Sequence, residues 1–149
     1  MTGTRRVFRG RLGPLVAYPI AAAVVVLLAV IARGLPAEGG LSFAAVDRVA
    51  LVLIGLAVAW FLHRLAAVRI VADDAGVSVH NVLRRRRVEW AEIVAVRLGP
   101  DDPWVYLDLA DGTALAGMGI QSADGDRARA AAAELAAMVA ARSQTPRDD

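Results

Sequence analysis

The 149-residue sequence contains neither cysteine nor lysine. Without cysteine, the chain has no disulfide bridge, no thiolate metal site and no cysteine nucleophile. Because lysine is missing, all 17 residues in the lysine and arginine class are arginine. We interpret this usage as the coding bias of a GC-rich genome, of the kind found in actinobacteria, and not as a functional signal.

Residues that carry chemistry are also sparse. The two histidines, His63 and His80, do not form a helical pair with metal-ligand spacing. No Ser/His/Asp arrangement can be recognised, and the Gly117–Gly119 segment lacks the strand–loop–helix context of a phosphate-binding loop. Turn chemistry accounts for most of the aspartates after the apolar region, which are Asp73, Asp74, Asp101, Asp102, Asp108 and Asp111. We therefore expect no enzyme, no metal site and no cofactor.

Two long apolar stretches organise the first half of the chain. Leu12 to Ala32 is 21 residues long without a charge, and a helix of that length is about 30 Å long, the thickness of a bilayer's hydrocarbon core. Val49 to Leu62 has only 14 uncharged residues, so it spans only if its flanking residues contribute. The sequence predicts a hairpin of two transmembrane helices, with a buried helix of a soluble core as the alternative for the second stretch.

The distribution of arginine predicts the topology. Four arginines and no acid precede the first span, at Arg5, Arg6, Arg9 and Arg11. Positive residues beside short-loop spans stay in the cytoplasm, so we expect a two-pass protein of the plasma (inner) membrane with both termini cytoplasmic. A signal peptide is the competing interpretation, but the apolar run is long and is followed by no small-x-small cleavage site. From His63 onward eleven arginines face thirteen acids, so we expect no nucleic-acid partner.

After Val68 the chain consists of short alternating segments typical of strands. About six antiparallel strands are expected, the last two joined at Asp111-Gly112, a strong hairpin signal. Asp124 is expected to cap a helix that reaches about Arg142 and buries one face. That face consists of Ala128, Ala131, Leu135, Met138 and Val139. The expected divisions are a basic cytoplasmic arm at 1–11, the hairpin at 12–66, a cytoplasmic domain at 67–142 and a disordered tail at 143–149.

Particular motifs in this second half resemble a known family. They are Ala75-Gly76-Val77, the stretch Val88-Glu89-Trp90-Ala91-Glu92-Ile93, the segment Leu107 to Gly112 and the closing helix. This order resembles a bacterial pleckstrin-homology (PH) domain, specifically the PH-like domain named after low molecular weight protein antigen 6 of mycobacteria. The resemblance implies a small α+β domain, a bent antiparallel sheet capped by a C-terminal helix, placed after two transmembrane helices. It implies a membrane-associated protein and brings no catalytic residues.

The densest charge cluster is Arg84, Arg85, Arg86 and Arg87, expected in a turn. Each basic residue near an anionic membrane gains about 1 kcal/mol, so the cluster is a candidate site for lipid or for a partner. A solvated turn that prevents edge aggregation and enforces topology is the plainer interpretation, because a tethered domain needs no lipid affinity for targeting.

The predicted function is therefore non-catalytic. We expect a membrane-anchored PH-like protein that presents a cytoplasmic module to membrane lipids, to a protein partner or to a second copy of itself. The alternative is a structural or assembly subunit that packs through its transmembrane helices against a partner membrane protein, for which small residues such as Gly55 permit close contact.

Overall fold

The computed structural model describes residues 5–34 and 43–143. The chain divides into two units, one comprising Gly13–Ala66 and the other combining Met1–Leu12 with Ala67–Asp149. The N-terminal segment therefore belongs to the same unit as the C-terminal half. Residues 35–42, within the expected hairpin, and residues 144–149 of the expected tail lie outside the described residues.

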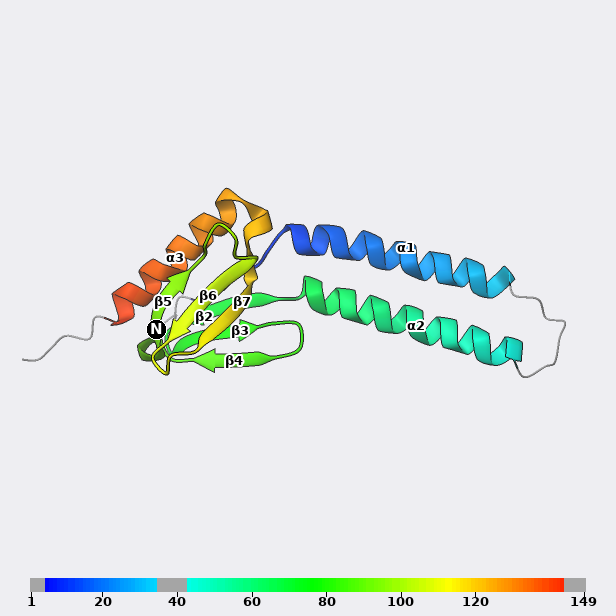
Figure 1. The fold of residues 1–149 in the computed structure, drawn as a ribbon, viewed down its shortest axis with the longest axis horizontal. Coiled ribbons are helices and arrows are strands. Elements are labelled where there is room, and N and C mark those ends of the chain that lie inside the picture. Colours follow the sequence, from blue (N-terminus) through cyan, green and yellow to red (C-terminus); the bar gives the residue numbers. More distant parts are fainter. Residues whose placement is uncertain (1–4, 35–42, 144–149) are drawn as a thin grey trace, which may run out of the picture. The chain divides into compact units, whose positions relative to one another are not determined.

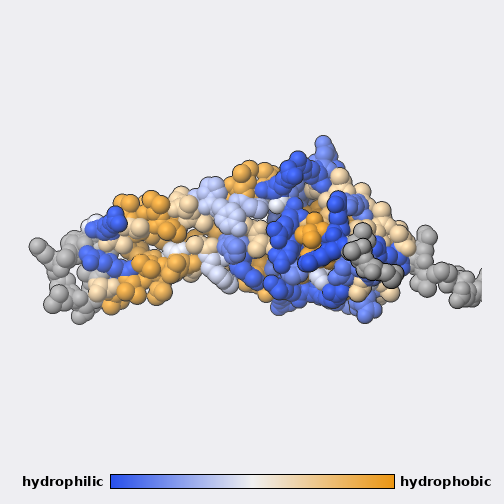
Figure 2. All heavy atoms as spheres, turned by 180° about the vertical axis from the view of Figure 1, so that it is seen from behind, coloured by the Kyte–Doolittle hydropathy of each residue, from blue (hydrophilic) through white to orange (hydrophobic). Residues whose placement is uncertain are grey.

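The helical unit contains α1 (Leu12–Gly34) and α2 (Phe43–Ala66). Leu12–Gly34 and Ala45–Ala66 are long and apolar enough to cross a membrane by length and composition. Only 6% of the residues in each apolar segment are buried, so the apolar side chains face outward (Figure 2). A core helix of a soluble protein buries most of its apolar side chains, and α2 does not. With 24 residues, α2 is also longer than its 14-residue apolar centre.

Within this unit α1 and α2 contact each other (Figure 1). The Tyr18 hydroxyl and His63 Nδ1 share a hydrogen bond of 3.3 Å. Farther along, a Cβ added to the buried Gly55 would lie 3.2 Å from Leu28 Cδ1, so glycine permits the helices to approach here. Gly55 therefore lies at the contact between α1 and α2 within the hairpin.

The other unit contains two antiparallel sheets (Figure 1). In the first the strand order follows the sequence: β1 (Arg6–Phe8), β2 (Arg69–Asp73), β3 (Gly76–His80) and β4 (Arg85–Val88). In the second it is β5 (Ile93–Arg97), β6 (Trp104–Leu109) and β7 (Ala114–Gln121). Alternation along β6 buries Val105, Leu107 and Leu109. The antiparallel strands predicted from the sequence are confirmed, and they form two sheets where one bent sheet was expected.

Strand β1 was not expected. The pattern assigned residues 1–11 to an arm outside the domain, whereas Arg6–Phe8 pairs antiparallel with β2 and places Phe8 opposite Ile70. The pairing occurs because Phe8 is apolar enough to enter the core, where it is only 6% exposed. A three-residue strand among arginines gives no alternation long enough to be recognised.

Helix α3 (Asp126–Ser143) packs against β5, β7 and the short helix η1 (Trp90–Glu92). The expected buried face is confirmed: three of its residues are buried and two are partly buried against the core, in chain order Ala128, Ala131, Leu135, Met138 and Val139. After β4 the chain does not continue as a strand through Trp90. The Glu92 carboxylate accepts the Glu89 N–H at 2.6 Å, forming a capping box that turns the chain into η1.

Asp124 does not cap α3. It ends the short helix η2 (Ser122–Asp124), and α3 starts two residues later, after Gly125. The Asp124 carboxylate instead accepts the backbone N–H groups of Arg11 and Leu12, at 3.0 and 3.1 Å. Asp124 thus fixes the end of the N-terminal segment to the domain.

Candidate functional site

The predicted arginine cluster lies mostly on a strand and not in a turn. The turn closes earlier, where the Asn81 N–H donates to the Arg84 carbonyl at 2.9 Å. The Asn81 side chain holds this turn to β7, donating to the Ala116 carbonyl at 2.7 Å and accepting the Met118 N–H at 3.1 Å. Only Arg84 therefore remains in the turn, and β4 begins at Arg85.

The alternation of β4 separates the arginines. Arg85 and Arg87 project from one face of the sheet and Arg86 from the other. The Arg87 guanidinium lies 2.8 Å from the Asp73 carboxylate, and that of Arg86 lies 3.7 Å from Asp111. Two of the four charges are therefore offset by carboxylates, whereas Arg84 and Arg85 have no ion pair within the described residues.

The strand register brings Arg85 beside cationic residues from other strands. Arg69 on β2 lies opposite His80 on β3, and His80 lies opposite Arg85 on β4. Residues opposite each other in a ladder project from the same face. We name these three residues the basic row. It lies on the outer face of the first sheet, away from the core residues Ile70 and Val79.

Two arginines of the N-terminal segment extend the positive potential of the basic row. The pKa of Arg69 is lowered, first by burial and then by the charges of Arg9, Arg85 and Arg5. Strand β1 causes this proximity, because Phe8 is paired with Ile70 and places Arg9 next to Arg69 along the ladder. Like charges held together without a neutralising carboxylate create a surface that attracts anions.

His80 is the titratable member of the basic row. Its pKa is lowered, first by burial and then by Arg69, Arg85 and Arg5. The buried His80 Nδ1 has no hydrogen-bond partner among the described residues. An anion over the basic row would oppose the arginine charges and bring the pKa of His80 back upward.

The sequence analysis found Arg85 but missed Arg5, Arg9 and Arg69 as members of the same surface. These residues are far apart in the sequence, and only the pairing of β1, β2, β3 and β4 brings them together. The one sequence signal for it was the apolar Val7-Phe8 pair inside a basic arm. Without a register that signal cannot indicate which residues become neighbours.

Within residues 5–34 and 43–143 no group of three or more His, Asp or Glu side chains is arranged to hold a metal ion. Turns hold several of the aspartates identified in the sequence. Asp73 accepts the Ala75 and Gly76 N–H groups. Asp111 accepts the Thr113 hydroxyl and N–H, and these two bonds, more than the nearby Arg86, lower the pKa of Asp111.

The comparisons with known proteins agree with this fold. A family model described as bacterial PH domain matches residues 67–137. An uncharacterized protein of Mycobacterium bovis is 38% identical over 128 residues, covering 84% of this chain and 82% of that protein. The chain belongs to the bacterial PH domain family. Uncharacterized proteins of two Mycobacterium tuberculosis strains match with the same identity and coverage. No solved structure matches the chain.

The similarity to these mycobacterial relatives extends beyond the bacterial PH domain. Only 83 residues follow Ala66 in this chain, so an alignment over 128 residues necessarily includes much of the helical unit. The similarity to these relatives therefore includes part of the sequence that forms the apolar helices of this chain. The resemblance inferred from the sequence motifs is confirmed.

Proposed function

We propose that the protein is a non-catalytic, two-pass membrane protein that presents its bacterial PH domain to the anionic lipid of the cytoplasmic leaflet. The observation that carries this proposal is the basic row, in which Arg69, His80 and Arg85 are aligned across three strands. Each arginine near an anionic surface contributes about 1 kcal/mol, so a few of them orient a domain that is already tethered.

Chain connectivity supports this role for the basic row. Arg9 precedes Leu12, where α1 begins, by three residues, and Arg69 follows Ala66, where α2 ends, by three residues. Three residues span at most about 10 Å of extended chain. Whatever the orientation of the domain, these arginines remain close to the ends of the apolar helices, where the headgroups of a bilayer lie.

The ion pairs of the described residues support a different set of lipid-facing residues from the run 84–87. Arg86 and Arg87 have carboxylates beside them, so they contribute less to binding than a run of four free arginines would. Arg84 and Arg85 remain available, and Arg69 and Arg9 join them. The proposed lipid-facing residues are therefore Arg9, Arg69, Arg84 and Arg85.

Hydrogen exchange of the full chain in nanodiscs tests the proposal. Nanodiscs of neutral lipid are compared with nanodiscs that also contain anionic lipid. We expect slower exchange in β3 and β4 with anionic lipid, reversed by high salt because exposed charges are screened. The variant Arg85→Gln should lose this protection, whereas Arg129→Gln, which removes an exposed arginine of α3 paired with Asp126, should keep it. Equal exchange in both lipids would overturn the proposal.

The alternative, an assembly subunit that packs through its helices, has less support. Gly55, one of the small residues that would permit close packing, already contacts Leu28 within the hairpin. A stable partner that co-purifies in detergent after deletion of residues 67–149 would favour this alternative over lipid binding by the domain.

A further inference from the structure

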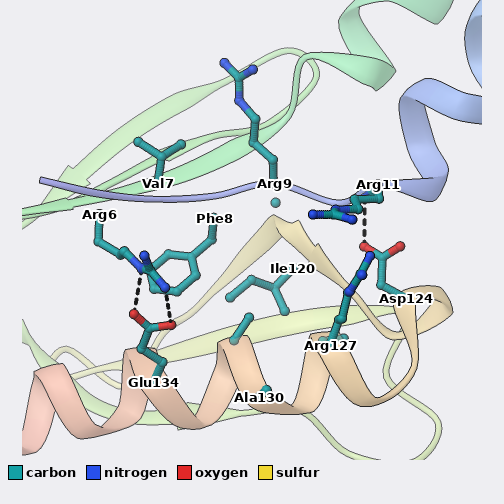
Figure 3. Close-up of a pocket in the computed structure, with 13 residues that line it drawn as sticks. Arg6, Val7, Phe8, Arg9, Arg11, Ile120, Asp124, Arg127, Ala130 and Glu134 are labelled. Carbon is teal, nitrogen blue, oxygen red and sulfur yellow. Dashed lines mark hydrogen bonds and ion pairs between the residues drawn. The ribbon is translucent and has the colours of Figure 1, made fainter.

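A hollow of about 340 Å³ lies between the N-terminal segment and α3 (Figure 3). We name it the arginine hollow. Its floor includes the buried Phe8, Ile120 and Ala128. Its polar lining comes from β1 and the residues that follow it, from η2 and from α3, and consists of Arg6, Arg9, Arg11, Asp124, Arg127 and Glu134.

Some of these charges are already engaged. Arg6 forms an ion pair with Glu134, with Nε 2.6 Å from Oε1, and donates a second bond at 3.0 Å. The Asp124 carboxylate accepts two backbone N–H groups. Within the described residues, the guanidinium groups of Arg11 and Arg127 have no hydrogen bond or ion pair.

The two unpaired arginines approach the same space from different elements. In Figure 3 the Arg127 side chain rises from α3 toward Arg11, and the Arg11 side chain extends into the hollow from the opposite wall. Arg9 also lines the hollow, but its side chain projects away from α3, unlike that of Arg127.

This geometry fits an anion. The Asp124 carboxylate in the lining accepts two backbone N–H groups and is bonded to neither guanidinium. The two guanidinium groups repel each other, and an anion between them converts this repulsion into attraction. Guanidinium groups present a planar fork of N–H donors that matches the oxygens of a phosphate group. A volume of 340 Å³ lies at the lower end of the range of about 300–1,000 Å³ for small-molecule sites.

We propose that the arginine hollow binds a phosphate ester, held between Arg11 and Arg127, with the Arg6–Glu134 pair closing one side. The phosphate comes either from a lipid headgroup or from a soluble phosphate ester. This site is separate from the basic row, because neither Arg11 nor Arg127 belongs to that row. The site also lies outside the run 84–87 that the sequence singled out.

Calorimetric titration of the full chain in neutral detergent tests this site. One titrant is glycerol phosphate, which has the headgroup chemistry without acyl chains, and the other is dihexanoyl phosphatidic acid, a short-chain phospholipid. Saturable binding of both titrants indicates recognition of the phosphate itself, and binding of the phospholipid alone indicates a lipid source. Either result supports the proposal if Arg11→Gln and Arg127→Gln each weaken binding by about tenfold or more, as expected for a lost charge-assisted hydrogen bond.

Arg129→Gln is the matched control, because it removes the same charge from the same helix two residues farther on and Arg129 does not line the hollow. It should bind as the parent chain does. Arg85→Gln should also bind normally, which separates this test from that of the basic row. All the exchanged side chains are exposed, so the thermal transition of each variant should match the parent. No binding of either titrant, or equal binding by Arg11→Gln, Arg127→Gln and the parent, would overturn the proposal.

Discussion

At the scale of single residues, the protonation of His80 makes the stability of the domain depend on pH. Arg69 from β2, Arg85 from β4 and Arg5 ahead of β1 act on it, and burial has the largest effect on its pKa. A histidine whose pKa is lowered by folding takes up its proton more readily in the unfolded chain. Its contribution to stability is therefore complete above the unfolded pKa of about 6.5 and is lost as the pH falls from there through the lower folded pKa.

We therefore expect the domain to lose stability as the pH falls below about 6.5, and we expect His80→Gln to reduce that loss. This loss of stability is measured by denaturant unfolding of the full chain in neutral detergent at several pH values. Anionic detergent should also reduce the loss in the parent chain, because negative charge raises the pKa of His80. Parallel pH profiles for the parent and His80→Gln would show that His80 has no such role.

Gly119 shows how closely the two sheets approach. A Cβ at this position of β7 would lie 2.6 Å from the Ile70 N atom and 2.7 Å from the Arg69 Cα atom of β2. Those neighbours are backbone atoms, which cannot move aside as a side-chain end can. We expect Gly119→Ala to lower the free energy of unfolding by about 2 kcal/mol or more, a typical cost of overpacking.

Chemical denaturation of the full chain in detergent checks the Gly119 prediction. Gly34→Ala is the control, since nothing lies within 4 Å of the added Cβ there, and its domain transition should be unchanged. If Gly119→Ala unfolds at the same denaturant concentration as the parent, the close approach of β7 to β2 is wrong.

At the scale of elements, β1 is a strand of only three residues, too short to be recognised from the sequence pattern. Phe8 is 6% exposed, whereas its neighbour Val7 is 43% exposed. Removing a buried phenylalanine side chain costs about 3–5 kcal/mol, and an exposed valine on an edge strand costs less than about 0.5 kcal/mol. We expect Phe8→Ala to destabilise the domain strongly and Val7→Ala to leave it nearly unchanged, as measured by thermal unfolding. Similar losses in both variants would show that β1 does not pack as described.

The other elements show what the sequence pattern can predict. Short apolar runs identified β2 and β5, and alternation of apolar with other residues identified strands such as β3 and β6. The pattern failed at β4, where Arg85, Arg86 and Arg87 precede Val88 and only one residue is buried. Charges are common on edge strands, where they prevent aggregation. A run of four arginines nevertheless shows no apolar alternation, and for that reason it was interpreted as a turn.

The candidate site was predictable only in part, for the same reason. The sequence identified Arg85 as a candidate, but Arg69 and His80 became its neighbours only through the register of β2, β3 and β4. Register depends on turn geometry and on core packing, and a single sequence with irregular turns does not fix it. The arginine hollow was less predictable still, because it requires β1 to lie beside α3.

At the scale of the whole molecule, the pairing of β1 with β2 constrains how the chain crosses a membrane. Residues Arg6–Phe8 precede both apolar helices and Arg69–Asp73 follow both, yet they form one ladder. A ladder of this kind forms only if both segments lie on the same side of the bilayer. If the apolar helices enter a bilayer, the chain between β1 and β2 must cross it an even number of times, and two spanning helices satisfy that requirement.

The absence of cysteine makes this topology directly testable. Single cysteines at Thr2, Gly39 and Gln144 are introduced one at a time, and a membrane-impermeant maleimide is applied to intact cells. Positive residues beside a span favour the cytoplasmic side. On the proposed topology, Thr2→Cys and Gln144→Cys should therefore be labelled only after the membrane is permeabilised, and Gly39→Cys should be labelled in intact cells. Labelling of Thr2→Cys and Gln144→Cys from opposite sides would separate β1 from β2 by a bilayer and is incompatible with the ladder. If both are labelled in intact cells and Gly39→Cys is not, the two segments are still on one side, but the domain faces outward and cannot bind the cytoplasmic leaflet.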